Sequence, residues 1–179
     1  MIRVTHLLAL GLLVLAMPAA GAVDAAAEKV GVYDSRVLAF AHFWSASERV
    51  DRDALIAAAR AAKQAGDTAK QAELTARIQS LQAASHLQVF STAPATEAMN
   101  ALAPRLPALA RELGVGRFVS KWDEAALAEI PAPQRVDVTD RLAAEFKPDE
   151  KRLKTIAEMK KVVPLPLEQA QARVKAGKL

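Results

Sequence analysis

Hydrophobic side chains first form a strand-like pattern at residues 29–35, where Val30, Val32 and Tyr33 give the segment β-branched and aromatic character. A second segment of this kind, residues 116–120, comes only after a long Ala-rich stretch with helical spacing. We predict that these two distant segments are strands that pair. Their pairing would join both ends of the helical stretch.

The Ala-rich stretch between the two strands predicts a helical arm. Leu74, Ile78 and Leu81 fall at spacings of four and three, which is typical of a coiled-coil-like stripe. Gly66 and Asp67 interrupt the helical pattern. An antiparallel hairpin that turns there and a single long helix with a weak point at Gly66 both fit, because one Gly costs only about 1 kcal/mol relative to Ala.

Short polar side chains mark the positions where helices are expected to begin. Asp34 and Ser35 follow the first strand, and either can accept a hydrogen bond from the first turn of a buried helix at residues 36–43. Ser47 is placed to cap the next helix, residues 48–65. We therefore predict that the first strand leads directly into a helix.

Two prolines, Pro104 and Pro107, interrupt the helical pattern of residues 97–113. Each proline removes a helical N–H and crowds the preceding turn, so we expect either a kink or two short helices.

Farther along the chain, residues 136–140 fit either a short strand or the beginning of a helix. Residues 149–163 fit a basic helix.

These elements predict an α+β protein that is mostly α, with a small β-sheet joining the ends of an α-helical hairpin arm and extra C-terminal helices. We divide the chain into a signal peptide at residues 1–22, a sheet body with a helical arm at residues 23–147, and a basic C-terminal helical extension at residues 148–179. Aromatic residues make up only 4% of the chain, so we expect the helices to pack closely through Ala and Leu side chains.

The start of the chain has the pattern of a secretory signal peptide. Arg3 supplies the positive end, residues 7–16 are apolar apart from one Gly, and residues 20–22 are small enough for a signal peptidase. A transmembrane anchor is the alternative, but it needs roughly 20 apolar residues, which is longer than this run. We therefore predict an exported protein that is cleaved near Ala22.

Basic residues are concentrated toward the C-terminus. Residues 23–112 hold ten basic and ten acidic residues, whereas residues 113–179 hold thirteen basic and ten acidic ones. Such a bias can attract an anionic membrane surface or an acidic partner, although ordinary solvated helix faces also explain it and are favoured. The basic tail lacks interleaved aromatic residues for stacking on bases, so we expect no nucleic-acid partner.

Candidate catalytic and metal-binding residues are sparse. The chain has no Cys and therefore no disulfide or thiol chemistry, and His42 and His86 are too far apart in the sequence for a zinc site with the usual ligands. Helix capping explains Asp34, Asp137 and Asp140 better than general acid–base catalysis, which would need a desolvated carboxyl. We predict that the protein is not an enzyme and uses no cofactor or metal.

Trp44 and Trp122 are notable in a chain with few aromatic residues. Exposed tryptophans would mark a binding surface. Packing at the junction of the sheet and the helices is the other interpretation, and it is the one we favour.

Three short segments together resemble the Skp/OmpH-like family of periplasmic chaperones. They are residues 29–35 as the opening strand, residues 113–119 as the end of a returning helix with its strand, and residues 136–140 before the closing helix. The resemblance covers residues 29–146, and the tail after Lys147 has no counterpart in it. It implies a small β-body assembled from three subunits, with helical arms that enclose unfolded outer-membrane proteins without ATP, a cofactor or a catalytic residue.

Two functions follow as predictions. The first is a non-catalytic periplasmic holding chaperone, a homotrimer in the resemblance, that binds unfolded outer-membrane or envelope proteins through apolar residues of the arm. Its candidate contacts, for which packing within the hairpin is the alternative role, are Leu74, Ile78, Leu81 and Leu87. The second is a structural or adaptor module that binds one defined envelope partner through the Trp44 and Trp122 region or through the basic tail. A hydrolase with an unrecognised site is a third and less favoured reading.

Overall fold

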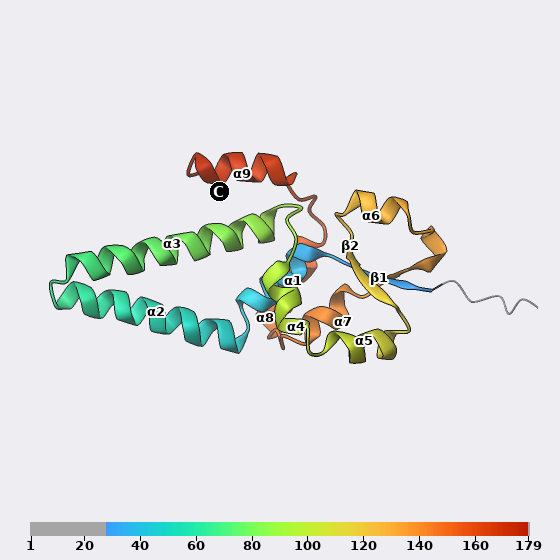
Figure 1. Cartoon of the computed structure of the whole chain (residues 1–179), viewed down its shortest axis with the longest axis horizontal. Coiled ribbons are helices and arrows are strands. Elements are labelled where there is room, and N and C mark those ends of the chain that lie inside the picture. The colour runs from blue at the N-terminus through green and yellow to red at the C-terminus, as the bar shows by residue number, and fades with distance from the viewer. Residues whose placement is uncertain (1–27, 179) are drawn as a thin grey trace, which may run out of the picture.

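The structure is a computed structural model that describes residues 28–178 (Figure 1). The predicted signal peptide and its cleavage position near Ala22 lie outside the described residues. Among residues 28–178, no helix combines the length and the apolar character needed to cross a membrane.

Within this part of the chain, a small parallel sheet is combined with nine α-helices, so the predicted mostly-α α+β class is confirmed. The strands are β1 (Val30–Tyr33), β2 (Arg117–Ser120) and β3 (Arg135–Asp137). The helices before β2 are α1 (Ser35–Phe43), α2 (Ala46–Gln64), α3 (Thr68–Phe90), α4 (Thr96–Leu102) and α5 (Leu106–Leu113). The later helices are α6 (Glu124–Ala128), the 3-10 helix η1 (Ala132–Gln134), α7 (Thr139–Ala144), α8 (Glu150–Met159) and α9 (Leu167–Lys175).

The sheet is organised around β1, which lies between β2 and β3 and runs parallel to both. Val30 is paired with Arg117 of β2 on one side and with Arg135 of β3 on the other. Parallel strands need crossover connections, and here α1 to α5 connect β1 to β2, while α6 and η1 connect β2 to β3. The predicted pairing of the two distant strands is confirmed. Residues 136–140 contain both the end of β3 and the beginning of α7.

α2 and α3 form an antiparallel hairpin that extends away from the sheet and its covering helices (Figure 1). Gly66 makes the turn with φ of +72°, a conformation that Gly adopts without the penalty of a side chain. The side chain of Asp67 then caps α3 by accepting a hydrogen bond from the N–H of Lys70 at 2.9 Å. Of the two interpretations of the arm, the hairpin is confirmed and the single long helix is wrong.

The prolines separate α4 from α5, so the prediction of two short helices is confirmed. After α4 the chain makes a tight turn in which the N–H of Arg105 donates to the carbonyl of Leu102 at 2.7 Å. Pro107 lies in the first turn of α5, where its missing N–H costs nothing. α5 ends at Gly114, whose φ of +63° is the left-handed conformation that commonly closes a helix.

Ser45, rather than the predicted Ser47, caps α2. Its hydroxyl accepts a hydrogen bond from the N–H of Glu48 at 3.4 Å, while the hydroxyl of Ser47 only lies beside it at 3.1 Å. The helix begins early because the turn after α1 is very short. In that turn the N–H of Ser45 already donates to the carbonyl of His42 at 2.9 Å.

The main core lies between the sheet and helices α1, α4, α5 and α7. Its largest buried side chains are those of Tyr33, Leu38, Leu102, Leu109 and Leu142. Burying an aliphatic or aromatic side chain of this size contributes about 1.5–3 kcal/mol. A smaller cluster of buried residues, which includes Ile156 of α8, joins that helix to α1 and α7.

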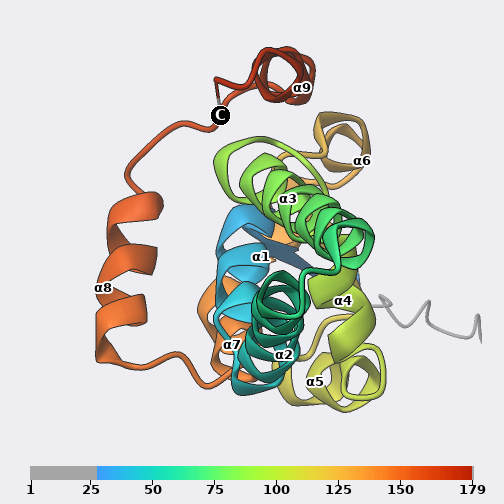
Figure 2. The ribbon, with the colours of Figure 1, turned by 90° about the vertical axis from the view of Figure 1, so that its left-hand side faces the viewer.

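The C-terminal extension is packed against the rest of the chain: α8 contacts α1, and α9 lies beside α3 (Figure 2). Residues 160–166, here called the strap, connect α8 to α9 past the end of α3. The N–H of Leu165 donates to the carbonyl of Phe90, and the carbonyl of Leu165 accepts from the N–H of Thr92, both at 3.0 Å. Ala170 of α9 is completely buried. The extension is therefore fixed to the body at several points.

Gly31, at the centre of β1, occupies a position with no space for a side chain. A Cβ atom there would lie 2.9 Å from Cδ1 of Phe118 and 3.0 Å from Cγ2 of Val138. We expect Gly31→Ala to lower the free energy of unfolding by about 1–3 kcal/mol, because overpacking displaces neighbouring side chains. Urea unfolding followed by circular dichroism measures this change. Adding Phe118→Leu to the Gly31→Ala variant should recover part of the lost stability. If Gly31→Ala alone is as stable as the original chain, the close packing around Gly31 is contradicted.

Candidate functional site

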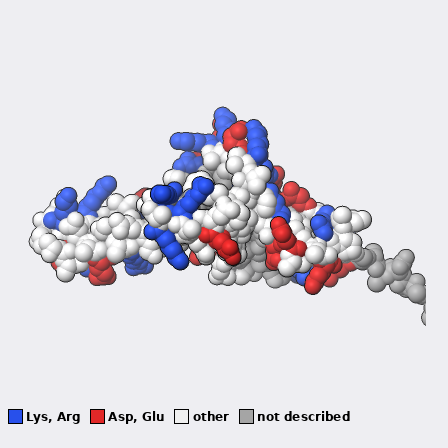
Figure 3. Space-filling view, turned by 90° about the horizontal axis from the view of Figure 1, so that it is seen from above, with Lys and Arg blue, Asp and Glu red and all other residues white. Residues whose placement is uncertain are grey.

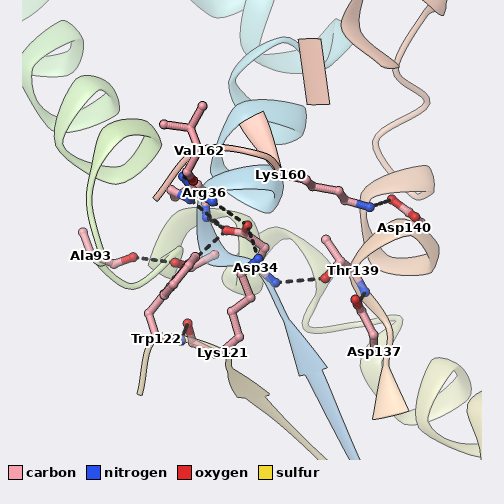
Figure 4. Close-up of polar contacts among 12 residues, drawn as sticks. Asp34, Arg36, Ala93, Lys121, Trp122, Asp137, Thr139, Asp140, Lys160 and Val162 are labelled. Atoms are coloured by element: carbon pink, nitrogen blue, oxygen red, sulfur yellow. Dashed lines mark hydrogen bonds and ion pairs between the residues drawn. The ribbon is translucent and has the colours of Figure 1, made fainter. Parts of the chain in front are cut away.

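The carboxyl ends of the three parallel strands bring charged and polar residues to one edge of the sheet (Figure 4). Asp34 follows β1, Lys121 and Trp122 follow β2, and Thr139 comes shortly after β3. Arg36, in the first turn of α1, completes the group, which we call the Asp34 centre. This edge of a parallel sheet is where ligands commonly bind, so it is the first candidate site.

The carboxylate of Asp34 is completely buried and is surrounded by five donors. Arg36 provides three of them: its backbone N–H and Nε lie 3.1 and 3.2 Å from Oδ1, and its Nη2 lies 2.9 Å from Oδ2. Nε1 of Trp122 donates to Oδ1 at 3.0 Å, and Nζ of Lys121 lies 2.7 Å from Oδ2. The N–H of Asp34 itself donates to the hydroxyl of Thr139 at 3.0 Å. The carboxylate therefore connects the ends of β1 and β2, and the backbone N–H of the same residue connects them to the segment after β3.

Further contacts extend from this centre to distant segments. The hydroxyl of Ser35 donates to the carbonyl of Ala93, just before α4, at 2.8 Å. Nη1 of Arg36 donates to the carbonyl of Val162, in the strap, at 2.7 Å. The guanidinium carbon of Arg36 also lies 4.9 Å from the ring centroid of Trp122, a cation–π arrangement. The centre thus holds the beginning of α4 and the strap in place as well.

The pKa of the Asp34 carboxyl is lowered from its ordinary value of 3.8. Burial alone acts to raise this pKa, but the hydrogen bonds from Arg36, Lys121 and Trp122, with the charge of Arg36, outweigh the burial. The carboxylate is therefore ionised at neutral pH, and its lone pairs are occupied by protein donors. This geometry suits a structural connection. Among the described residues, no three His, Asp or Glu side chains are grouped to hold a metal ion.

Asp137 and Asp140, which we expected to cap a helix, do not occupy the N-cap position of α7. Oδ1 of Asp137 accepts a hydrogen bond from the N–H of Thr139 at 2.9 Å, but the N-cap position of α7 is Val138, which has no capping side chain. Asp140 lies at the surface and forms an ion pair with Lys160. The reason is that β3 continues to Asp137, whereas Asp140 already lies within α7.

A second candidate site is a groove at the base of the hairpin, where α2 and α3 meet α1, with a volume of about 560 Å³. We call it the hairpin groove. Its walls are predominantly apolar and include Phe43 of α1, Leu55 of α2, and Ile78 and Leu81 of α3. This volume falls within the range of ligand pockets in proteins. Unlike the Asp34 centre, the groove is open to a binding partner.

Charged side chains of both signs surround the groove, namely Glu48, Asp51, Arg52, Arg77 and Glu97. Arg52 fixes the position of Phe43, which forms one wall of the groove. Its Nη1 donates to the carbonyl of Phe43 at 3.0 Å, and its guanidinium carbon lies 4.4 Å from the centroid of the Phe43 ring. Oε1 of Glu48 lies 3.4 Å from Nε2 of His42. The lining is thus preformed, with polar groups at its edge.

The structure brings two of the four predicted leucine and isoleucine contacts together in the groove. Ile78 and Leu81 line it, and the side chain of Leu81 is 53% exposed. Leu74 is only 7% exposed and is buried in the hairpin, and Leu87 is half-buried outside the groove lining. Only part of the stripe is therefore available to a partner.

The two tryptophans lie in different surroundings. Trp122 is half-buried and packs at the junction of the sheet and α1, as part of the Asp34 centre. Trp44 is exposed at the end of α1, where its ring meets the Phe43 ring edge-on at 5.3 Å. The guanidinium carbons of Arg52 and Arg152 lie 5.2 and 4.9 Å from the Trp44 ring. The structure does not bring the two tryptophans together in one surface.

Phe43 and Leu55 were not predicted as contact residues, although they form two walls of the groove. A signal for both exists in the sequence. Leu55 is one of the few large apolar residues of α2, and Phe43 ends a short apolar helix with a large ring. The sequence alone does not show where α1 lies relative to the hairpin, because packing in the core determines that position.

Comparisons of this chain with family models, with curated proteins and with solved structures find no match. The resemblance to Skp/OmpH-like chaperones therefore depends on the three short segments described above.

Asp34→Asn tests whether the Asp34 centre holds the fold together. The substitution leaves the buried guanidinium of Arg36 without its counter-charge, and breaking a buried ion pair in this way typically costs about 3–5 kcal/mol. We expect a loss of that size in urea unfolding. Asp53→Asn, an exposed change on α2, is the matched control and should alter stability by less than about 0.5 kcal/mol. If Asp34→Asn and Asp53→Asn are equally stable, the structural role of Asp34 is contradicted.

The lowered pKa of Asp34 also predicts how stability depends on pH. A carboxyl whose pKa is lower in the folded than in the unfolded protein contributes stability that is fully present above the unfolded pKa. For Asp34 that upper limit is near 3.8. Glu145, whose pKa is lowered by hydrogen bonds from Arg141 and Arg105, acts in the same direction below its ordinary value of 4.5.

We therefore expect the free energy of unfolding to fall as the pH decreases below about 4.5, and to continue falling toward the lowered pKa of Asp34. Urea unfolding at a series of acidic pH values measures this dependence. Asp34→Asn should have a flatter profile, since it lacks one of the carboxyls whose pKa is lowered in the folded protein. A profile as steep as that of the original chain would show that other carboxyls are responsible.

Proposed function

We propose that this protein is a non-catalytic, chaperone-like holding protein of the periplasm, and that its hairpin groove binds apolar segments of unfolded outer-membrane or envelope proteins. The observation that supports the proposal most directly is an open groove with predominantly apolar walls. Leu81 and Ile78 offer aliphatic surface there, and Phe43 offers an aromatic ring. Because apolar burial is non-directional, such a groove selects apolar side chains rather than a particular sequence.

The groove accommodates only a few client side chains at a time. Each Leu, Phe or Met that a client buries fully contributes about 1.5–3 kcal/mol. Part of this is offset by the cost of ordering the client and the groove residues. Binding is therefore weak and reversible, which suits a protein that must later release its client.

The second function is that of an adaptor for one defined envelope partner, which would bind through the Trp44 and Trp122 region or through the basic extension. The holding protein would bind apolar segments of many unfolded proteins, whereas the adaptor would bind a single native partner. Homotrimeric assembly, which the resemblance implies, belongs to the first proposal.

Leu81→Ser is the sharpest test of the groove. Leu81 is half exposed, so its removal should leave the fold intact while taking one apolar contact from a client. The readout is light scattering from an outer-membrane protein that is diluted out of denaturant in the presence of the mature chain. We expect the original chain to suppress aggregation at a stoichiometric ratio, and Leu81→Ser to require about tenfold more protein.

The matched control is Val50→Ser. Val50 is 68% exposed on α2 but does not line the groove, so this variant should suppress aggregation like the original chain. If the original chain leaves the scattering unchanged, the holding function is wrong. Saturable binding of one native envelope protein would then support the adaptor. If Leu81→Ser is as effective as the original chain, clients bind elsewhere.

A further inference from the structure

The C-terminal extension differs in charge from the rest of the structure. Residues 147–178 hold nine basic and four acidic residues, a formal charge of +5, whereas residues 28–146 hold fourteen basic and fifteen acidic ones. Figure 3 looks down on the molecule from the side of α9 and shows Lys and Arg side chains gathered on this face. The extension therefore forms a basic surface attached to a nearly neutral body.

Two valines of the extension are strongly exposed. Val162 and Val163, in the strap, are 63% and 84% exposed, and they directly follow Lys160 and Lys161. Large aliphatic side chains that are this exposed are unusual in a chain whose other valines are mostly buried or half-buried. Neither valine lines the hairpin groove.

The strap presents the valines on a fixed backbone. The carbonyl of Val162 accepts the 2.7 Å hydrogen bond from Arg36, and Leu165 is bonded on both its N–H and its carbonyl to the segment after α3. Pro164, which is buried, restricts the backbone between these two attachments. The two aliphatic side chains are therefore held outward before any partner arrives, which lowers the ordering cost of binding.

The lysines near the strap form ion pairs with exposed carboxylates. Lys161 pairs with Glu158 and Lys154 pairs with Glu150, each at 2.7 Å on the exposed surface of α8. Exposed pairs of this kind contribute little to stability and exchange readily with solvent. An anionic surface could therefore attract these lysines without disturbing the fold.

We infer that the strap and the flanking basic residues form a docking surface for an anionic phospholipid bilayer. The lysines match the negative headgroups, and the valines insert at the boundary between headgroups and acyl chains, where they need no complementary pocket. An acidic protein would match the charges but would need a cavity shaped for the two valines. Each basic residue held near an anionic membrane raises the partition coefficient about fivefold. This inference does not depend on the proposed function of the groove.

The test is co-sedimentation of the mature chain with vesicles of phosphatidylcholine alone or of equal parts phosphatidylcholine and phosphatidylglycerol. We expect binding to the anionic vesicles only, and weaker binding as the ionic strength rises from about 0.01 to about 0.15 M, where the screening length falls from about 30 to about 8 Å. The double variant Lys154→Gln/Lys161→Gln should lower the partition coefficient about twentyfold. Val162→Ser/Val163→Ser should lower it several-fold at unchanged charge.

Matched controls are available on the hairpin. Lys63→Gln/Lys70→Gln removes the same charge from α2 and α3, and Lys70 also has an exposed acidic partner three residues away, as Lys161 does. Val50→Ser removes an equally exposed valine. Both controls should bind within about twofold of the original chain. Circular dichroism verifies that every variant is folded.

Three outcomes would overturn the inference. The first is that the chain does not sediment with anionic vesicles. This outcome would also be expected if the extension binds an acidic protein instead of a membrane. The second is equal binding to neutral vesicles, which would remove the role of charge. The third is a loss in the hairpin controls as large as in the strap and α8 variants, which would place the interaction elsewhere.

Discussion

Moving an ionised carboxylate out of water costs several kcal/mol unless charged and hydrogen-bonding partners replace the solvent. At Asp34 these partners come from three parts of the chain: Arg36 in α1, and Lys121 and Trp122 after β2, with Thr139 receiving the backbone N–H. The cost is offset only when all of these segments are in place together. The buried charge therefore penalises partly folded arrangements in which α1 and the segment after β2 are not assembled at the end of β1.

The parallel direction of β1 and β2 determines where the hairpin lies. A parallel connection must cross from one end of the sheet to the other, and here the crossing includes α1, the hairpin, α4 and α5. α1 packs against the sheet and also against α3, so it occupies the space at the base of the hairpin. α2 and α3 lie close together near Gly66 and are farther apart where α1 meets them (Figure 1). The groove follows from that separation.

Local features were predictable from neighbouring residues, whereas the sites depended on distant ones. The turn at Gly66 and the break at Pro104 each depend on the backbone preference of one residue, and both were among the alternatives that the sequence predicted. The partners of Asp34 were not, because Trp122 is 88 residues away and nothing near Asp34 specifies it. Likewise Leu74 and Leu81 belong to the same helical stripe, but one is buried and the other exposed. Their difference arises from the separation of α2 and α3 toward the base, which the periodicity of one helix cannot show.

The two binding surfaces proposed for this protein differ in how they depend on the body. The hairpin groove exists because α1 holds two long helices apart, so it would be lost if the hairpin closed or if α1 moved. The strap is attached through a single backbone carbonyl to Arg36, and through it to the buried carboxylate of Asp34. A change that releases Asp34 would therefore weaken this attachment of the strap, while the two backbone hydrogen bonds of Leu165 would remain. The rigidity of the sheet body is what allows both a groove and a projecting aliphatic pair to be presented to partners already in their bound geometry.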